Sequence, residues 1–388
     1  MKKFWPILVL GFVGFVTSFG AHIVAVNLPT YAEQIGVGVA MIGLLISVYD
    51  LAEIVAKPLF GAFADRQGMK QTMLSGIALF TLASLAYLFV DPRLLLLIRF
   101  LQGLGAAALS AVSVAMVGAY ITKEKGKAYG IYNSIKGAGY IISPIIGGAI
   151  VLQSKFSSIF LAAAVVGAIA FGLSLLLPKP ELEVKNVLAD EDDDFSFHGF
   201  FAVFRQPNLW PWYIVTVVNM FFVGILFGFL PVRIYALGYN PVVSGLLLSA
   251  VAASYLLIQP FAGILADRSS PALTIRIGLL LAGVCIVLAP FVDGFSLLIV
   301  SILAGFGVGT VWTNTDALIS DLAQAGKLGT TMGAAGSFKE FGDMLGPLLI
   351  GVVSQALGLT TGFVVCGILG LLSVILISNR RTLVTVIN

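Results

Sequence analysis

Residues 61–66 read GAFADR, and nearly the same hexapeptide returns as GILADR at residues 263–268. The two copies lie 202 positions apart in a chain of 388 residues, so the chain repeats itself after about half its length. The same offset aligns Gly103 with Gly305. A repeat of this kind predicts two copies of one structural unit.

The composition around these hexapeptides is that of a membrane protein. Hydrophobic residues make up 59% of the chain and charged residues 11%, against about 25% charged residues in ordinary soluble domains. A helix needs about 20 mostly apolar residues to cross a bilayer. Twelve such runs are expected, at residues 5–28, 39–62, 71–90, 94–120, 128–152, 157–178, 210–235, 242–265, 272–292, 295–317, 329–354 and 358–378.

A second repeated stretch extends the symmetry to later helices. At an offset of 203, SIKGAGYIISP at residues 134–144 aligns with SFKEFGDMLGP at residues 337–347. The fold we expect is therefore an all-α membrane protein with twelve transmembrane helices in two pseudo-symmetric six-helix bundles. The expected domains are an N-terminal bundle at 1–178, a cytoplasmic linker at 179–208 and a C-terminal bundle at 209–388.

The positive charges set the expected orientation. If the N-terminus is inside, fifteen of the 22 lysines and arginines fall on cytoplasmic segments, as the positive-inside rule requires. We therefore expect a multi-pass protein of the cell membrane with both termini in the cytoplasm. Cys285 and Cys366 lie far apart in apolar runs and indicate neither a metal site nor a disulfide framework.

Ionisable side chains inside the apolar runs are the candidate functional residues. A charge at the bilayer centre costs about 2.5–3.5 kcal/mol even on the lenient insertion scale, so each should face a partner or a water-filled cavity. These residues are Asp50, Glu53, Lys57, Arg99, Lys136, Lys339, Glu340 and Asp343.

Helical spacing places several of these charges on shared faces. Asp50, Glu53 and Lys57 follow one another at i, i+3 and i+7, and Glu53 precedes Lys57 by the four residues that favour an ion pair. Lys339 and Asp343 are also four residues apart. We therefore expect one charged face in each half of the chain.

Three motifs resemble those of the major facilitator superfamily, and the resemblance covers essentially the whole chain. GAFADRQGMK at residues 61–70 is similar to the family's loop motif after helix 2, although Met69 replaces a basic residue. RFLQGLGAA at residues 99–107 fits the helix-4 motif. The stretch at residues 130–148, in the fifth expected helix, resembles the antiporter motif of efflux branches. The matching residues are Gly130, Gly139, Pro144, Gly147 and Gly148, and Ser143 stands where the motif has a glycine.

The resemblance implies two mechanical elements. One is a latch, in which a carboxylate of the loop motif lies at the positive N-terminal end of helix 11. This placement stabilises the contact by about 0.3–1 kcal/mol. The latch residues are Gly61, Asp65, Arg66, Gly263, Asp267 and Arg268. The other is a deformable helix 5 at the moving domain interface, with helix 11 as its repeat mate, and static packing is the alternative. The hinge or packing residues are Gly139, Pro144, Gly147, Gly148, Gly342 and Pro347.

The family architecture also places helix 2 beside helix 11, which suggests how protons could be coupled to motion. Asp50 or Glu53 would pair with Lys339 in one conformation and take up a proton after separation. The alternative is a permanent structural ion pair, above all Glu53 with Lys57. The candidate proton-coupling residues are Asp50, Glu53, Glu340 and Asp343.

Three basic residues are candidates for substrate binding or gating. Lys136 and Lys339, related by the repeat, would suit an anionic group, or Lys136 would neutralise an acidic residue of helix 2. Arg99 resembles a family residue assigned to proton transfer or to organising helix 1. Because arginine stays protonated, it can position a carboxylate or a water but hardly relays a proton.

The function we expect is secondary transport that exports small amphipathic compounds in exchange for protons. A carrier of anionic metabolites or lipid-linked anions is the alternative, and a third hypothesis is a non-transporting membrane sensor. We expect no enzyme activity, no metal and no cofactor, with protons as the coupling ion. The expected partners are a small-molecule substrate and the lipid bilayer, without nucleic acid, and the protein is expected to act as a monomer.

Overall fold

The described part of the chain in this computed structural model is helical. The structure describes residues 4–28, 31, 36–89, 91, 94–120, 125–153, 156–178, 207–322 and 328–378. The expected linker at 179–208 lies outside these residues, except for its last two positions.

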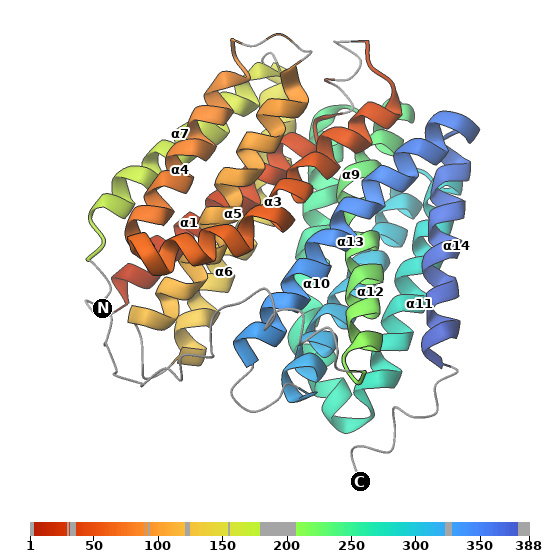
Figure 1. The fold of residues 1–388 in the computed structure, drawn as a ribbon. Coiled ribbons are helices and arrows are strands. Elements are labelled where there is room, and N and C mark those ends of the chain that lie inside the picture. Colours follow the sequence, from red (N-terminus) through yellow and green to blue (C-terminus); the bar gives the residue numbers. More distant parts are fainter. Residues whose placement is uncertain are drawn as a thin grey trace. The chain divides into compact units, whose positions relative to one another are not determined.

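Twelve α-helices occupy the described residues, and each begins and ends within five residues of an expected run (Figure 1). The first six are α1 (Trp5–Ala25), α3 (Val39–Gln67), α4 (Met69–Ala86), α5 (Leu95–Tyr120), α6 (Lys125–Gln153) and α7 (Ser157–Leu175). The other six are α9 (Trp210–Ala236), α10 (Pro241–Arg268), α11 (Pro271–Leu288), α12 (Gly294–Leu322), α13 (Leu328–Leu357) and α14 (Leu359–Ser378). The short 3-10 helix η2 (Ala289–Phe291) follows α11.

The hexapeptide at residues 61–66 lies in the last two turns of α3 rather than in a loop. The helix ends only at Gly68, whose φ of 96° is in the left-handed region. Glycine adopts this conformation readily because it has no Cβ, so the chain can reverse there and start α4 at once.

Nine of the described helices are long and apolar enough to cross a membrane. They are α1, α3, α5, α6, α7, α9, α10, α11 and α12. Helix α13 carries Lys339, Glu340 and Asp343 in its middle, and α4 begins with Lys70 and Gln71. In α14 the described apolar stretch covers residues 359–374. Helices α4, α13 and α14 are therefore not among the nine because they carry charged or polar residues or have a short described apolar stretch.

The chain divides into two compact units. Unit 1 comprises Met1–Phe195 and Ile234–Ser249, so it holds α1 to α7 together with the end of α9 and the start of α10. Unit 2 comprises Ser196–Arg233 and Ala250–Asn388. In unit 1, α5 packs against α3, α4 and α1, while α6 packs along α1. In unit 2, α11 packs against α12 and α14.

Equivalent glycines make equivalent contacts in the two units. In unit 1, a Cβ on Gly103 of α5 would overlap the backbone oxygen of Tyr49 on α3. In unit 2, a Cβ on Gly305 of α12 would overlap the backbone oxygen of Val251 on α10. Both the glycines and the oxygens that they meet are 202 positions apart. The sequence repeat is therefore a repeat of backbone-to-backbone helix packing, which is the way helices gain contact in lipid.

Candidate functional site

The charged face of α3 belongs to unit 1. Asp50 and Glu53 are buried, each with 7% of its surface exposed. Glu53 forms an ion pair with Lys57 one turn further along the helix, with 2.5 Å between the oxygen and the nitrogen. The pair expected from the i, i+4 spacing is therefore present. Pairing compensates the charge of Glu53 locally, which lowers the cost of keeping it in an apolar helix.

Arg99 joins three helices of unit 1 from a buried position. Its Nε donates to the backbone oxygen of Leu45 on α3 at 3.1 Å, and its Nη2 donates to that of Ala21 on α1 at 3.5 Å. Its Nη1 donates to Gln102 at 2.9 Å, and the guanidinium lies 4.3 Å from the ring centre of Tyr49. These contacts position helices; the role in proton transfer stays a prediction.

Lys136 is half-buried on α6, one turn before Tyr140. The ring of Tyr140 makes an edge contact of 4.5 Å with the ring of His22 on α1. Helices α1 and α6 pack along each other, which brings His22 to this position. Lys136 thus stands beside an aromatic and imidazole cluster of unit 1.

Helix α6 is approached closely on two faces. Gly139 and Gly147 meet α1, where a Cβ on either would overlap Ser18 and Asn27 respectively. On the other face, a Cβ on Gly148 would overlap the backbone of Pro241 at the start of α10.

The start of α10 meets α6 in return. A Cβ on Gly245 would overlap the backbone oxygen of Pro144. Ser249 donates a hydrogen bond to the backbone oxygen of Ile141 at 2.6 Å. The glycines and proline that were expected to form a packing interface therefore do pack closely. The bending role predicted for them stays a prediction.

In α13 the corresponding residues have similar surroundings within unit 2. A Cβ on Gly342 would overlap the backbone oxygen of Val217 on α9. Pro347 lies inside the helix and faces Gly224 of α9. The repeat therefore places a closely packed α9–α13 pair in unit 2 where α1–α6 stands in unit 1.

The ion pair of unit 2 joins α13 to α12. The ammonium of Lys339 lies 2.6 Å from Oδ2 of Asp316 and 5.0 Å from the ring centre of Trp312. Asp316 was missed as a candidate, although an acidic residue at the end of the apolar run 295–317 was a visible signal. The predicted pairing of Lys339 with Asp50 or Glu53 stays a prediction; within its own unit, Lys339 pairs with Asp316.

A small pocket surrounds this ion pair. Side chains fill it so closely that no space for a water molecule remains. All of its lining residues belong to unit 2: Thr216, Asn219, Met220, Trp312, Thr315, Asp316 and Lys339. The ammonium and the carboxylate thus meet in a recess that is aromatic on one side and polar on the other.

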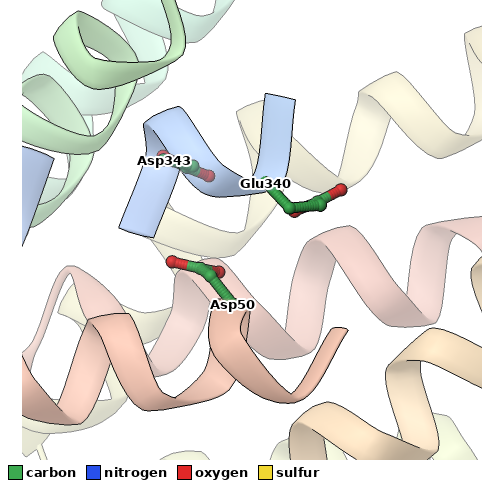
Figure 2. A group of neighbouring side chains, drawn as sticks. All are labelled: Asp50, Glu340 and Asp343. Carbon is green, nitrogen blue, oxygen red and sulfur yellow. The ribbon is translucent and has the colours of Figure 1, made fainter. Parts of the chain in front are cut away.

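Two further carboxylates stand one turn apart on α13. Figure 2 shows Glu340 and Asp343 on this helix, and Asp50 on α3. An oxygen of Glu340 lies within 4.8 Å of an oxygen of Asp343. Two carboxylates this close repel each other when both are ionised. Their part in proton coupling stays a prediction.

The hexapeptide residues are only partly described. Gly61, Asp65 and Arg66 lie on α3 and Asp267 lies on α10, but their side chains are outside the described part of the structure. Gly263 has room for a side chain, because the nearest atom, Cγ2 of Thr313, is 3.9 Å from the position of a Cβ. The side chain of Arg268 is exposed. The latch stays a prediction.

Two repeated helical units that hold ionisable side chains in apolar helices define a multi-pass membrane transporter rather than an enzyme. The family model of the Major Facilitator Superfamily matches residues 10–244 and 213–383, and the chain belongs to this superfamily.

The relatives carry transporter names. The chain is 27% identical over 368 residues to the multidrug resistance protein MdtL of Shigella flexneri, covering 93% of each chain. It is 30% identical over 190 residues to the riboflavin transporter RibZ of Clostridioides difficile, which is 48% of this chain and 42% of RibZ. The match therefore spans less than half of RibZ.

A solved structure shares the fold. It is a bacterial homologue of the human lysosomal transporter Spinster, with a TM-score of 0.81 at 15% identity over 97% of each chain.

Proposed function

We propose that the protein exports small amphipathic compounds in exchange for protons by alternating access. The observation that carries this proposal is the burial of Asp50 and Glu53 in an apolar helix of a major facilitator protein. A carboxyl group in such a position is inexpensive when protonated and costly when charged. Proton uptake and release by Asp50 or Glu53 therefore change the free energy of the conformation in which these side chains are buried.

Export of drug-like compounds is favoured by the relatives with multidrug-resistance names and by the close packing of α6. One relative that matches 93% of the chain, MdtL of Shigella flexneri, is called a multidrug resistance protein. Helix α6, which resembles the antiporter motif, meets the start of α10 through Gly148 and Gly245. An interface without side chains between the backbones can close tightly and be opened again at the cost of dispersion contacts alone.

We assign the remaining candidates to the same cycle. The protein spans the cell membrane. Asp65 and Asp267 act as latches at the cytoplasmic ends of α3 and α10. Glu340 and Asp343 add proton-binding groups in α13. The protein functions as a monomer. It needs no cofactor, and protons are the ion that drives transport.

Proton movement in proteoliposomes tests the proposal. Purified protein is reconstituted with a pH-sensitive dye inside, and cationic, neutral and anionic amphipathic compounds are added in turn. We expect some compounds to move protons in the wild type, and Asp50→Asn combined with Glu53→Gln to abolish the response.

Asp293→Asn is the matched control, because Asp293 is exposed at the start of α12 and asparagine caps a helix equally well. Unchanged proton movement in the Asp50→Asn/Glu53→Gln variant would refute the proposal. Transport of labelled anions without proton movement would instead favour the anion carrier.

A further inference from the structure

The pocket of unit 2 offers hydrogen-bond acceptors that nothing in it satisfies. Asn219 and Thr315 are almost fully buried, with 1% and 2% of their surfaces exposed. Asn219 Oδ1, Thr315 Oγ1 and Asp316 Oδ1 are buried atoms without a hydrogen-bond partner. Buried polar atoms of folded proteins usually have hydrogen-bond partners, so three such acceptors around one recess suit a ligand that brings donors.

The orientation of the Asn219 amide is fixed by its other end. Its Nδ2 donates to the backbone oxygen of Val308 at 3.3 Å, and a carbonyl can only accept. The oxygen of the amide is therefore the atom left without a partner. The recess thus presents two obligate acceptors, on Asn219 and Asp316, and one hydroxyl that can also accept.

The ammonium of Lys339 already occupies a site built for a cation. It pairs with Asp316 Oδ2 at 2.6 Å and stands 5.0 Å from the ring centre of Trp312. The Trp312 ring is held by Tyr255, which stacks on it at 5.9 Å with an angle of 5° between the rings. A carboxylate beside an aromatic face is a strong combination for binding an ammonium group.

We propose that the Asp316–Trp312 site binds the ammonium group of a cationic amphipathic substrate, and that Lys339 is a resident cation which the substrate displaces. This inference rests on the proposed function, since it names the substrate class and the binding event. A substrate ammonium carries three donors, which can meet Asp316, Asn219 and Thr315 together. The lysine ammonium is tethered to α13, and its partner among these three residues is Asp316.

The displaced lysine has a second position on its own helix. Asp343 lies four residues after Lys339, the spacing at which helical side chains meet. Glu340 stands beside Asp343, so this turn of α13 carries negative charge for an ammonium. Each ammonium therefore has a carboxylate beside it after the exchange: the substrate pairs with Asp316, and Lys339 moves towards Asp343.

The size of the recess limits what it can hold. Beside the Lys339 ammonium the recess has no room for even a water molecule, so another group can enter only as that ammonium leaves. The site therefore accommodates the charged head of a substrate rather than the whole molecule. The apolar remainder must bind elsewhere, so a broad range of tails is compatible with one selective head.

Equilibrium dialysis with purified full-length protein in detergent tests this exchange without requiring transport. The probes are 4-phenylbutylammonium, the neutral 4-phenylbutanol and the anionic 4-phenylbutyrate, which share one aromatic tail. We expect the ammonium probe to bind more tightly than the other two. Tighter binding of the butyrate, or no binding of the ammonium, would overturn the proposal.

Two variants distinguish a lysine that the substrate displaces from a lysine whose ion pair only stabilises the fold. Asp316→Asn should weaken binding of the ammonium probe about tenfold or more, because a charge-assisted hydrogen bond is lost. Lys339→Gln should tighten it several-fold, because removing an internal competitor raises the fraction of binding-competent protein. A purely structural pair predicts weaker or unchanged binding in Lys339→Gln, and that result would overturn the proposal. Asp293→Asn serves as the control.

One variant leaves the ion pair intact in case Lys339→Gln does not fold. Trp312→Phe should weaken binding of the ammonium probe at least about threefold, since tryptophan gives the strongest cation–π contact, and should leave 4-phenylbutanol unaffected. Equal ammonium binding in this variant would refute the site. If ammonium binding depends on Asp316 but no proton exchange occurs in liposomes, only the proposed function is refuted. If proton exchange occurs but Asp316→Asn binds the ammonium probe as the wild type does, only the site is refuted.

Discussion

The hydroxyl of Ser249 on α10 donates to the backbone oxygen of Ile141 on α6, with 2.6 Å between the two atoms. Gly245, one turn earlier on α10, meets the backbone of Pro144 without any side chain between them. A hydrogen bond and a backbone contact thus hold the start of α10 against α6. Both would have to break if the two helices separate during a transport cycle.

Ser249→Ala tests the hydrogen bond. The loss should destabilise the packed arrangement by about 0.5–1.5 kcal/mol, because one buried hydrogen bond disappears. Labelling of a cysteine that replaces Ser244, which is buried at the start of α10, should become several-fold faster than in the same cysteine variant with Ser249. Ser269→Ala is the control, since Ser269 is exposed and its hydroxyl contacts Leu265 and Thr274 rather than α6.

Gly148→Ala tests the backbone contact. The added Cβ would overlap the backbone of Pro241, which cannot rotate away, so we expect a cost of about 1–3 kcal/mol and slower transport. Gly172→Ala adds the same methyl group to α7, where no atom lies within 4 Å. Transport assays and thermal unfolding of both variants decide the matter. Equal behaviour of the two variants would contradict the close packing of α6.

Arg99→Lys tests the role of the buried arginine. Lysine keeps the charge but cannot reach Leu45, Ala21 and Gln102 together, so the melting temperature should fall, with a loss of at least about 2 kcal/mol. The ratio of protons to substrate in the folded fraction should stay unchanged. Arg268→Lys, at an exposed end of α10, should leave the melting temperature unaltered. A changed ratio in Arg99→Lys would favour proton transfer instead.

A double-mutant cycle on Glu53 and Lys57 tests whether their ion pair is structural. The single variants Glu53→Gln and Lys57→Met each remove one partner, and the double variant removes both. We expect a coupling energy of about 0.5–2 kcal/mol in thermal unfolding, because the two groups are in contact and mostly shielded from water. Additive effects would show that the pair contributes nothing to stability.

The sequence alone located the helices because a membrane imposes long apolar runs. All twelve helices were predicted to within five residues, and the largest errors lie at the polar ends of α3 and α12. There the helix continues beyond the hydrophobic run, since hydrogen bonding along the backbone does not require apolar side chains. Only a backbone feature such as the positive φ of Gly68 stops it.

The candidate site was predictable only where the residues share a helix. The Glu53–Lys57 pair follows from spacing on α3. The Lys339–Asp316 pair joins two helices across 23 positions, and spacing within one helix cannot reveal it. The Ser249–Ile141 bond was likewise hidden, because any residue can supply the backbone oxygen that accepts it.

The change of offset between the two halves has an evolutionary consequence. Helices α5 and α12 end 202 positions apart, whereas α6 and α13 begin 203 positions apart, so the halves differ by one residue in the connection between these helices. One residue added inside a helix would rotate everything beyond it by about 100° around the axis. Gly103 and Gly305 would then turn away from the backbones that they touch. The halves have therefore diverged by one residue between these helices without disturbing the register of the packed glycines.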